Sequence, residues 1–255
     1  MSSHIAACHV HSEWSYDAEW TLGEIAEAFH FRGCSVVLMS EHDRGWSDAK
    51  WKEYCEACRA ASRDGMLLVP GIEYSDPRND VHTLVWGAHD FLGEGLETTE
   101  LLNRVERAGG SAVLAHPERH EAWRLFQPEW FDRILGVEVW NRKTDGWAPS
   151  QRGLALWRHS GVAPFASLDF HRKNQFFPLR MRLECAEILS VESVFAALAA
   201  GNVAPEYRGN ALIPLVKPGS LRGLRILEVL RRILRWSHPR SWAPRSANRY
   251  NHRSL

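Results

Sequence analysis

The feature that most constrains the fold of this chain is a regular alternation of short apolar runs with longer segments of helical spacing. The apolar runs, which are typical of strands buried on both faces, include residues 5–8, 35–39, 66–70, 112–115 and 163–168. Helical spacing is clear in residues 22–29, 47–63, 98–108, 150–159 and 190–200. Such alternation predicts parallel strands and an α/β architecture. About seven such units favour a closed or nearly closed barrel over an open sheet.

The composition fits one substantial globular core, because the chain has 255 residues, of which 45% are hydrophobic and 24% charged. No basic flank precedes a long apolar segment at the start, and no run of about 18 apolar residues occurs, so neither a secretory signal nor a transmembrane helix is expected. The five cysteines are odd in number and scattered, which favours reduced thiols and a cytoplasmic location. Cys55 and Cys58 form a single Cys-x-x-Cys in the expected helix 47–63, where packing is the favoured role.

Histidines and acids stand at the ends of the apolar runs. His9 and His11 follow the first run, and side chains two apart in an extended strand project to the same side, so both rings are expected to point toward one place. Similar residues end or begin other runs, or lie in the first loop: Asp17, His42, Glu73, His82, His116, Asp169 and His171. At the carboxyl ends of barrel strands these side chains would converge.

So many imidazoles and carboxylates in one place predict a metal centre. Taken singly, each residue is also compatible with a polar side chain that is satisfied at a strand end. Together and without a cation, they would bury lone pairs and like charges with nothing to balance them. Imidazole and carboxylate suit Zn, Mn or Fe, and this number of donors exceeds what one ion needs. We therefore expect two or three divalent metal ions.

The motifs of this chain resemble those of the polymerase and histidinol phosphatase (PHP) superfamily. In chain order they are His9-Val-His11-Ser12, Ser15-Tyr-Asp17, Ser40-Glu41-His42-Asp43, Gly71-Ile72-Glu73, His82, Ala115-His116-Pro117 and Ser167-Leu-Asp169-Phe-His171. They fall within residues 4–200. The resemblance implies a distorted (β/α)7 barrel that carries a trinuclear metal site at its mouth, at the C-terminal ends of the strands.

The resemblance also implies a ligand set. One ion would be held by the expected catalytic residues His9, His11, Glu73 and Asp169; Glu73 would bridge to a second ion held with His82 and His116; and the third would be held by Asp17, His42 and His171. Ala7-Cys8 stands where the family has an acid before His-x-His, and Glu41 stands where Asp is common. Because these positions support the ligands, we expect slightly altered geometry rather than loss of the site.

The predicted chemistry is hydrolysis of a phosphate ester, with a phosphomonoester of a small molecule as the expected substrate. Divalent ions a few ångströms apart lower the pKa of water from about 15.7 toward neutrality, and they neutralise phosphoryl charge. Positive side chains close to the motifs are candidate substrate contacts: Arg44, Arg119, Arg172 and Lys173. Asn141 is a further candidate, either for supporting a ligand or for binding substrate.

Two other functions fit the same residues. One is a phosphodiesterase or exonuclease acting on short nucleic acid, which the basic C-terminal residues and the tryptophans near strand ends would suit. The other is a non-catalytic, metal-bound scaffold. A scaffold has no need of a complete ligand set, so the sequence favours an enzyme.

The C-terminal residues differ from the rest of the chain in charge. Residues 217–255 contain ten basic residues and one acid, Glu228, and the preceding part has a net charge of −9. This division predicts a barrel domain, residues 1–216, and a basic segment, residues 217–255. Residues 221–236 have the pattern of a basic amphipathic helix, which would pack its apolar face on the barrel or bind an anionic membrane surface or nucleic acid. Disorder is expected from residue 237 onward, where Pro, Ser, Arg and Asn dominate.

Overall fold

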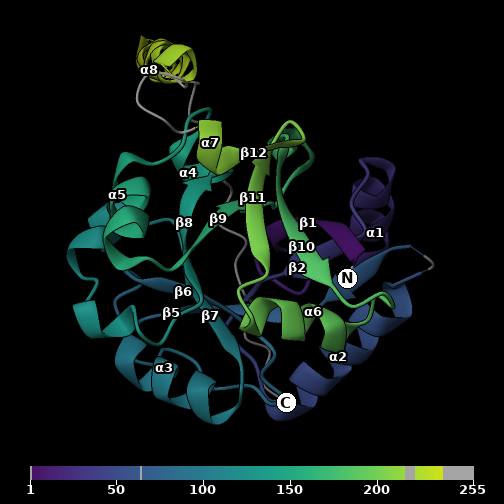
Figure 1. Cartoon of the computed structure of the whole chain (residues 1–255). Coiled ribbons are helices and arrows are strands. Elements are labelled where there is room, and N and C mark those ends of the chain that lie inside the picture. Colours follow the sequence, from purple (N-terminus) through teal and green to yellow (C-terminus); the bar gives the residue numbers. More distant parts are fainter. Residues whose placement is uncertain (1, 64, 216–221, 238–255) are drawn as a thin grey trace, which may run out of the picture.

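The computed structural model describes residues 2–63, 65–215 and 222–237, which form a mixed α/β fold (Figure 1). The strands are β1 (Ser2–Val10), β2 (Val36–Met39), β3 (Glu41–His42), β4 (Leu67–Val69), β5 (Gly71–Ser75), β6 (His82–Trp86), β7 (Ser111–Leu114), β8 (Gly136–Asn141), β9 (Ala163–Ser167), β10 (Leu179–Cys185), β11 (Val203–Tyr207) and β12 (Asn210–Ala211). The α/β class predicted from the sequence is confirmed.

Helices lie around the strands (Figure 1). They are α1 (Leu22–Phe31), α2 (Asp48–Ala61), α3 (Thr98–Arg107), α4 (Arg142–Asp145), α5 (Gln151–Ser160), α6 (Val191–Ala199), α7 (Leu212–Leu215) and α8 (Arg222–Ser237), with short 3₁₀ helices at Arg119–Arg124, Pro128–Trp130 and Lys173–Gln175. Local chemistry fixes where they begin. At α1, the hydroxyl of Thr21 accepts the N–H of Glu24, and the Glu24 carboxylate accepts the N–H of Thr21, which is a capping box.

The strands pair in two six-stranded sheets, with the orders β12-β11-β10-β1-β2-β4 and β3-β5-β6-β7-β8-β9. Pairing is parallel for β1 with β2, β2 with β4, β3 with β5, β7 with β8 and β8 with β9. The predicted parallel arrangement is wrong for β6, which is antiparallel to both β5 and β7. Residues 76–81, between β5 and β6, are too few for a crossover. They form a turn in which the Asp76 carboxylate accepts the N–H groups of Asp80 and Val81.

The two sheets are joined at both sides. A single residue separates β2 from β3 and β4 from β5, so each of these pairs runs from one sheet into the other. On the opposite side, the N–H of Leu168 donates to the Cys8 carbonyl at 3.0 Å, and the N–H of Phe170 donates to the His9 carbonyl at 3.0 Å. These bonds hold the end of β9 beside the end of β1.

Core packing fixes the strand that carries Glu73. A Cβ atom added to Gly71 would lie 2.3 Å from the Trp86 indole and 2.5 Å from the Met39 carbonyl oxygen. The indole fills this space, and its Nε1–H donates to the same carbonyl at 2.8 Å. Glycine is therefore required here by the close approach of β2, β5 and β6. The Trp86 ring also stacks on Phe165 of β9, with centroids 6.3 Å apart.

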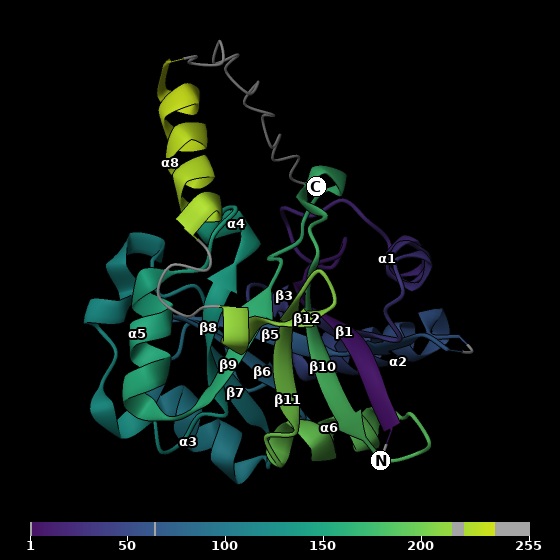
Figure 2. The same cartoon turned by 45° about the horizontal axis from the view of Figure 1, so that its top comes forward.

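Helix α8 lies beside α4 and stands clear of both sheets (Figure 2). Leu224 packs against the hydrophobic core, and the buried Glu228 accepts the N–H of Trp147 at 3.0 Å. Within the helix, Glu228 also forms ion pairs with Arg231 and Arg232. Large apolar side chains of this helix are 48–63% exposed, namely Ile226, Leu227, Val229, Leu230, Ile233 and Leu234. The expectation that the apolar face packs on the barrel therefore holds for Leu224 but is wrong for these exposed residues, because Glu228 also faces the domain.

Within the described residues, no helix combines the length and apolar character that crossing a membrane requires. The expected tail after Ser237 lies outside the described residues. All five cysteines are free, and Cys58 is buried on α2 as a packing residue.

Candidate metal centre

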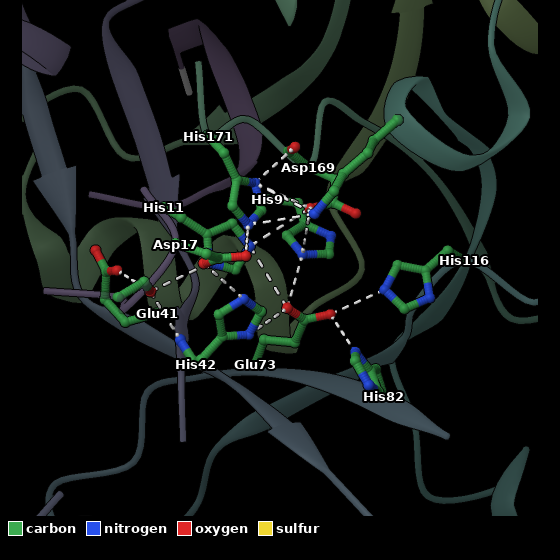
Figure 3. Close-up of polar contacts among 12 residues, drawn as sticks. His9, His11, Asp17, Glu41, His42, Glu73, His82, His116, Asp169 and His171 are labelled. Carbon is green, nitrogen blue, oxygen red and sulfur yellow. Dashed lines mark hydrogen bonds and ion pairs between the residues drawn. The ribbon is translucent and has the colours of Figure 1, made fainter. Parts of the chain in front are cut away.

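The structure brings the nine predicted ligand side chains into one cluster, which Figure 3 shows. They are His9, His11, Asp17, His42, Glu73, His82, His116, Asp169 and His171. They come from the C-terminal ends of β1, β3, β7 and β9, from the middle of β5, from the start of β6 and from the loop after β1. Because β6 is antiparallel, its first residue lies at the same end as the last residues of its neighbours. Asp17 is partly exposed, and the other members are at most 9% exposed.

Glu73 lies at the centre of the cluster. Its Oε1 is 2.7 Å from Nδ1 of His82 and 2.8 Å from Nε2 of His116. Its Oε2 faces three further rings, at 3.1 Å from His42 Nδ1, 3.3 Å from His9 Nε2 and 3.4 Å from His11 Nε2. The two oxygens of one carboxylate thus divide five imidazoles into two groups, which is the position a bridging ligand needs.

Two further carboxylates complete the cluster. Asp169 Oδ1 lies 3.3 Å from His171 Nδ1, 3.6 Å from His11 Nε2 and 3.9 Å from His9 Nε2. Asp17 lies 3.2 Å from Nε2 of His42 and 3.2 Å from Nε2 of His171. The loop after β1 therefore carries Asp17 over the rings of two other elements, at the solvent side of the cluster.

Three members of the cluster have a left-handed backbone, with φ of +62° at His9, +24° at His116 and +50° at Asp169. Such conformations cost a non-glycine residue on the order of 1–3 kcal/mol and persist where the surrounding structure imposes them. At His9 the pairing of β1 with β2 shifts between Cys8 and Val10, which is a β-bulge. Simple alternation along an extended strand is therefore the wrong reason for the meeting of His9 and His11. The bulge aims the two rings, whose centroids are 5.1 Å apart.

Charge in the cluster is shared between carboxylates and imidazoles. Burial alone would raise the pKa of Glu73, but His9 and the other rings hold it well below its ordinary value. Burial acts to lower the pKa of His9, but the carboxylates of Glu73, Asp169 and Glu138 raise it well above its ordinary value. Against burial, Asp17 and Glu73 likewise raise the pKa of His42 to about 10. The carboxylates thus attract positive charge to the centre, and protons or metal cations can supply it.

Glu138 of β8 is a supporting residue that sequence reasoning missed. Its side chain is fully buried, with Oε1 2.8 Å from Nδ1 of His9. Its Oε2 accepts the backbone N–H of His116 at 2.7 Å and the side-chain amide of Asn141 at 2.9 Å. With Nδ1 held in this way, His9 presents Nε2 to the cluster. The signal in the sequence was an acid inside an apolar run, since such residues are rarely buried without a partner. Asn141 thus acts through Glu138.

Glu41 supports the opposite side of the cluster. It accepts hydrogen bonds from the hydroxyl of Ser12 at 2.6 Å and from that of Ser15 at 2.5 Å. The Ser15 oxygen in turn lies 3.3 Å from His11 Nδ1 and accepts the backbone N–H of His42 at 3.0 Å. A glutamate at this position therefore anchors the loop that orients two of the rings.

A cavity of about 310 Å³ opens over the cluster. Of the predicted substrate contacts, Arg44 and Arg119 line this cavity, Arg172 lines an adjoining cavity of about 530 Å³, and Lys173 lines neither. Lys143 of α4, which sequence reasoning missed, lines both, and its Nζ lies 3.0 Å from Asp169 Oδ1. No motif marks Lys143, because tertiary packing brings α4 to the site.

The cluster fits metal ions in donor type and in unmet hydrogen bonding. The buried Nε2 atoms of His9, His11 and His42, together with Nδ1 of His116, have no hydrogen-bond partner in the described part of the chain. Buried nitrogens without a hydrogen bond are costly, and a cation would satisfy them. Three sets of donors each lie within 4.8 Å of one another: His11, His42 and His171; His9, Glu73 and His116; and His9, His11 and Asp169. Nε2 of His82 is held by the side-chain oxygen of Asn79 at 2.7 Å, so Nδ1 is the ring nitrogen that faces Glu73 and could bind a metal.

The fold and the cluster define an α/β protein with a candidate metal centre at its strand ends. The sequence matches no family model and no curated protein with which it was compared. Among solved structures, the chain is similar to a two-domain protein from Bacteroides vulgatus ATCC 8482 that contains a predicted PHP-like metal-dependent phosphoesterase. The TM-score is 0.64 at 15% identity, over 81% of this chain and 65% of that one.

Two further structures are similar. A protein from Bifidobacterium adolescentis ATCC 15703, proposed to be a metal-dependent phosphoesterase, matches with a TM-score of 0.50 and 19% identity over 66% of this chain and 88% of that one. The lesion-specific endonuclease PfuEndoQ from Pyrococcus furiosus matches with a TM-score of 0.56 and 16% identity over 78% of this chain and 56% of that one. This chain therefore spans 65% of the first protein and 56% of the endonuclease. It shares the fold of these structures, the first of which contains a domain described as PHP-like.

Proposed function

We propose that this protein is a metal-dependent phosphoesterase that hydrolyses a phosphomonoester of a small molecule. The cluster centred on Glu73 carries the proposal, because the cavity over it is also lined by Arg44, Arg119 and Lys143. Imidazoles and carboxylates bind divalent cations, and guanidinium and ammonium groups bind phosphate. A cavity of about 310 Å³ suits a small substrate.

We assign the ions as the family resemblance implies. One ion would be held by His9, His11, Glu73 and Asp169. A second would be held by Glu73, His82 and His116, and a third by Asp17, His42 and His171. The centre would thus contain two or three ions of Zn, Mn or Fe. When bound, such ions lower the pKa of water and neutralise phosphoryl charge, which provides a hydroxide nucleophile at neutral pH. The position of Glu73 between two groups of rings supports this assignment.

Side chains around the cluster would bind and orient the substrate. Burial acts to lower the pKa of Lys143, but Asp169 raises it, so the ammonium group stays charged beside the cluster. The Arg119 guanidinium is positioned by a hydrogen bond to the Asn79 carbonyl at 2.7 Å. In a centre with two ions, a ring facing Asp17, either His42 or His171, could supply the proton that the leaving oxygen needs.

We further infer that the strands of residues 1–216 form one distorted (β/α)7 barrel. Counting β2 with β3 and β4 with β5, the strands from β1 to β9 occupy seven positions that pair in succession. The hydrogen bonds from Leu168 and Phe170 to β1 support closure of this ring. On this reading β10, β11 and β12 extend the sheet outward from β1.

A phosphodiesterase or exonuclease acting on short nucleic acid is the second candidate. Similarity to the lesion-specific endonuclease favours it, and so does the positive lining of the adjoining cavity by Arg142, Arg172 and Arg231. Assays of phosphorylated metabolites and of oligonucleotides, each with added Mn²⁺, separate the candidates. Hydrolysis confined to oligonucleotides would reject the small-molecule assignment.

Replacement of a central ligand tests the metal-dependent mechanism. We expect His9→Ala to lower metal content and to reduce turnover by at least about 100-fold, because the ring contributes to two of the donor sets. His159→Ala, at an exposed position on α5, is the control. Metal content and turnover at native levels in His9→Ala would contradict the mechanism. Bound metal with no hydrolysis of any ester would instead favour a scaffold.

A further inference from the structure

The cavity of about 530 Å³ beside the metal centre has a strongly positive lining. Arg142 and Lys143 come from α4, Arg172 from the segment after β9, and Arg231 from α8, whose position beside α4 is seen in Figure 2. Asp17 is the one carboxylate among the residues that line it. Asp17 and Lys143 also line the cavity over the cluster, so the two cavities share a boundary.

The positive charges in this lining are incompletely compensated. Arg231 is paired with Glu228, and Lys143 with Asp169. Arg172 has a carboxylate oxygen of Glu19 no closer than 3.9 Å. Arg142 contacts the Phe177 ring, and its buried Nε has no hydrogen-bond partner in the part of the chain that the structure describes. Burial and the nearby charge of Arg231 lower the pKa of Arg142, against the smaller opposing effect of Glu228.

The segment that carries Arg172 is fixed by its own hydrogen bonds. Oε1 of Gln175 accepts the backbone N–H of His171 at 2.5 Å and that of Arg172 at 2.6 Å. The Gln175 side chain therefore fixes the backbone of both Arg172 and the cluster residue His171. A group bound by Arg172 would consequently be held at a set place relative to the cluster.

We propose that this cavity is a second anion subsite, which binds a second phosphate group of the same small substrate while its scissile phosphate lies at the cluster. This inference rests on the proposed function for the scissile phosphate, but the subsite is defined by its own residues. A phosphate would accept hydrogen bonds from the guanidinium groups of Arg142 and of the weakly paired Arg172, and it would relieve the repulsion between Arg142 and Arg231. Helix α8 thus contributes to substrate selection through Arg231.

The direct test is phosphate binding by the full chain after removal of metal with a chelator. Calorimetric titration with inorganic phosphate should show saturable binding, and Arg142→Gln and Arg172→Gln should each weaken it by at least about tenfold, because each loses a charged hydrogen bond. Absence of binding would overturn the subsite. Loss of binding in Arg44→Gln, with native binding in Arg142→Gln, would also overturn it. Equal weakening in Arg182→Gln, a β10 position away from the cavity, would indicate an adventitious ion only.

Arg231 and Arg232 provide a matched pair of variants. Both pair with Glu228, but Arg231 lines the cavity and Arg232 does not. Arg231→Gln should therefore weaken phosphate binding more than Arg232→Gln does. Equal effects would mean that the helix acts on the cavity through its docking alone, and the assigned role of Arg231 would be wrong.

The metal-loaded protein tests whether the second phosphate belongs to the substrate. The ratio of kcat/KM for fructose 1,6-bisphosphate to that for fructose 6-phosphate should exceed one, and Arg172→Gln should lower this ratio by about tenfold or more. A ratio unaffected by Arg172→Gln would overturn the proposal. Phosphate binding without hydrolysis of any ester would retain the subsite and reject the proposed function. Hydrolysis of oligonucleotides alone would assign the second anion to a neighbouring phosphodiester and overturn the small-molecule form of the proposal.

Discussion

Replacement of Glu138 by glutamine tests how the chain prepares His9 to bind metal. The Oε2 side of Glu138 receives two N–H donors, from the His116 backbone and the Asn141 amide, so the carbonyl oxygen of a glutamine would be retained there. The NH₂ group would then face Nδ1 of His9, which lies 2.8 Å from Oε1 in the native chain. Nδ1 would have to accept a hydrogen bond, and the ring proton would move to Nε2. That nitrogen faces the cluster and would lose its lone pair for a metal.

The expected loss follows from this one contact. A hydrogen bond to a charged group contributes about 1.5–3 kcal/mol, which corresponds to about 10-fold to 150-fold in affinity. Loss of residues that orient ligands lowers metal affinity by about 10-fold to 100-fold. We therefore expect Glu138→Gln to weaken metal binding by about 10-fold to 100-fold, with turnover falling as the metal is lost. Equilibrium dialysis against buffered Zn²⁺ or Mn²⁺, followed by elemental analysis, measures the affinity.

Asp145→Asn is the matched control. Asp145 is also buried, and its Oδ2 accepts the backbone N–H of Asn141 at 2.7 Å, but the residue contacts no ring of the cluster. Burial raises the pKa of Asp145 well above its ordinary value, so the amide replaces a carboxyl whose charged form is disfavoured by burial. Its metal affinity should stay within about twofold of the native value. If Glu138→Gln folds normally and binds metal as tightly as the native chain, the argument from the His9 tautomer is refuted.

Two further predictions concern helix docking and pH. Gly146→Ala would place a Cβ atom 2.3 Å from Oε2 of Glu228 and should release α8, so that trypsin cuts at the arginines of the helix about tenfold faster. Gly161→Ala has a similar positive φ and open space around it, so it should not change the rate of cutting in α8. Equal rates in the two variants would contradict docking through Glu228. In the presence of a chelator, stability should fall on both sides of neutral pH. Neighbouring positive groups lower the pKa values of Glu73 and Asp169 against burial, so the stability these carboxylates contribute is complete above about pH 4.5 and is lost as the pH falls below it. The pKa of His42 is raised to about 10, so the stability that this ring contributes is complete below about pH 6.5 and is lost as the pH rises toward about 10. Denaturant unfolding at pH 3, 7 and 10 measures this, and equal free energies of unfolding at pH 7 and 10 would contradict the raised pKa of His42.

The sequence predicts the α/β class and the set of converging side chains because both depend on local patterns. Apolar runs fix the strands, and the residue that follows a buried strand must lie at its end. The antiparallel direction of β6 is set instead by the length of its connection to β5, which the alternation of apolar and helical segments does not reveal. The left-handed backbone of His9 is likewise invisible in the sequence, since nothing in the segment marks a bulge there.

The residues that sequence reasoning missed act through contacts between distant segments. Lys143 reaches Asp169, which is 26 positions away, and Glu138 reaches His9, which is 129 positions away. Glu138 could have been found as an acid within an apolar run, but Lys143 carries no such mark. The outward apolar face of α8 was also unpredictable, because helical periodicity shows that a helix has two faces and leaves open which of them the domain holds.

Helix α4 connects these separate findings. Asn141 caps it by accepting the N–H of Thr144 at 3.0 Å, and the same side chain donates to Glu138. The helix carries Lys143 to Asp169, and Gly146 directly after it lies against Glu228 of α8. One turn of helix therefore links the residue that orients His9, the ammonium group beside the cluster and the docking point of the C-terminal helix. A change in how α8 docks should for this reason first alter the positions of Lys143 and the residues of the anion subsite. It should affect the metal ligands only through Asn141.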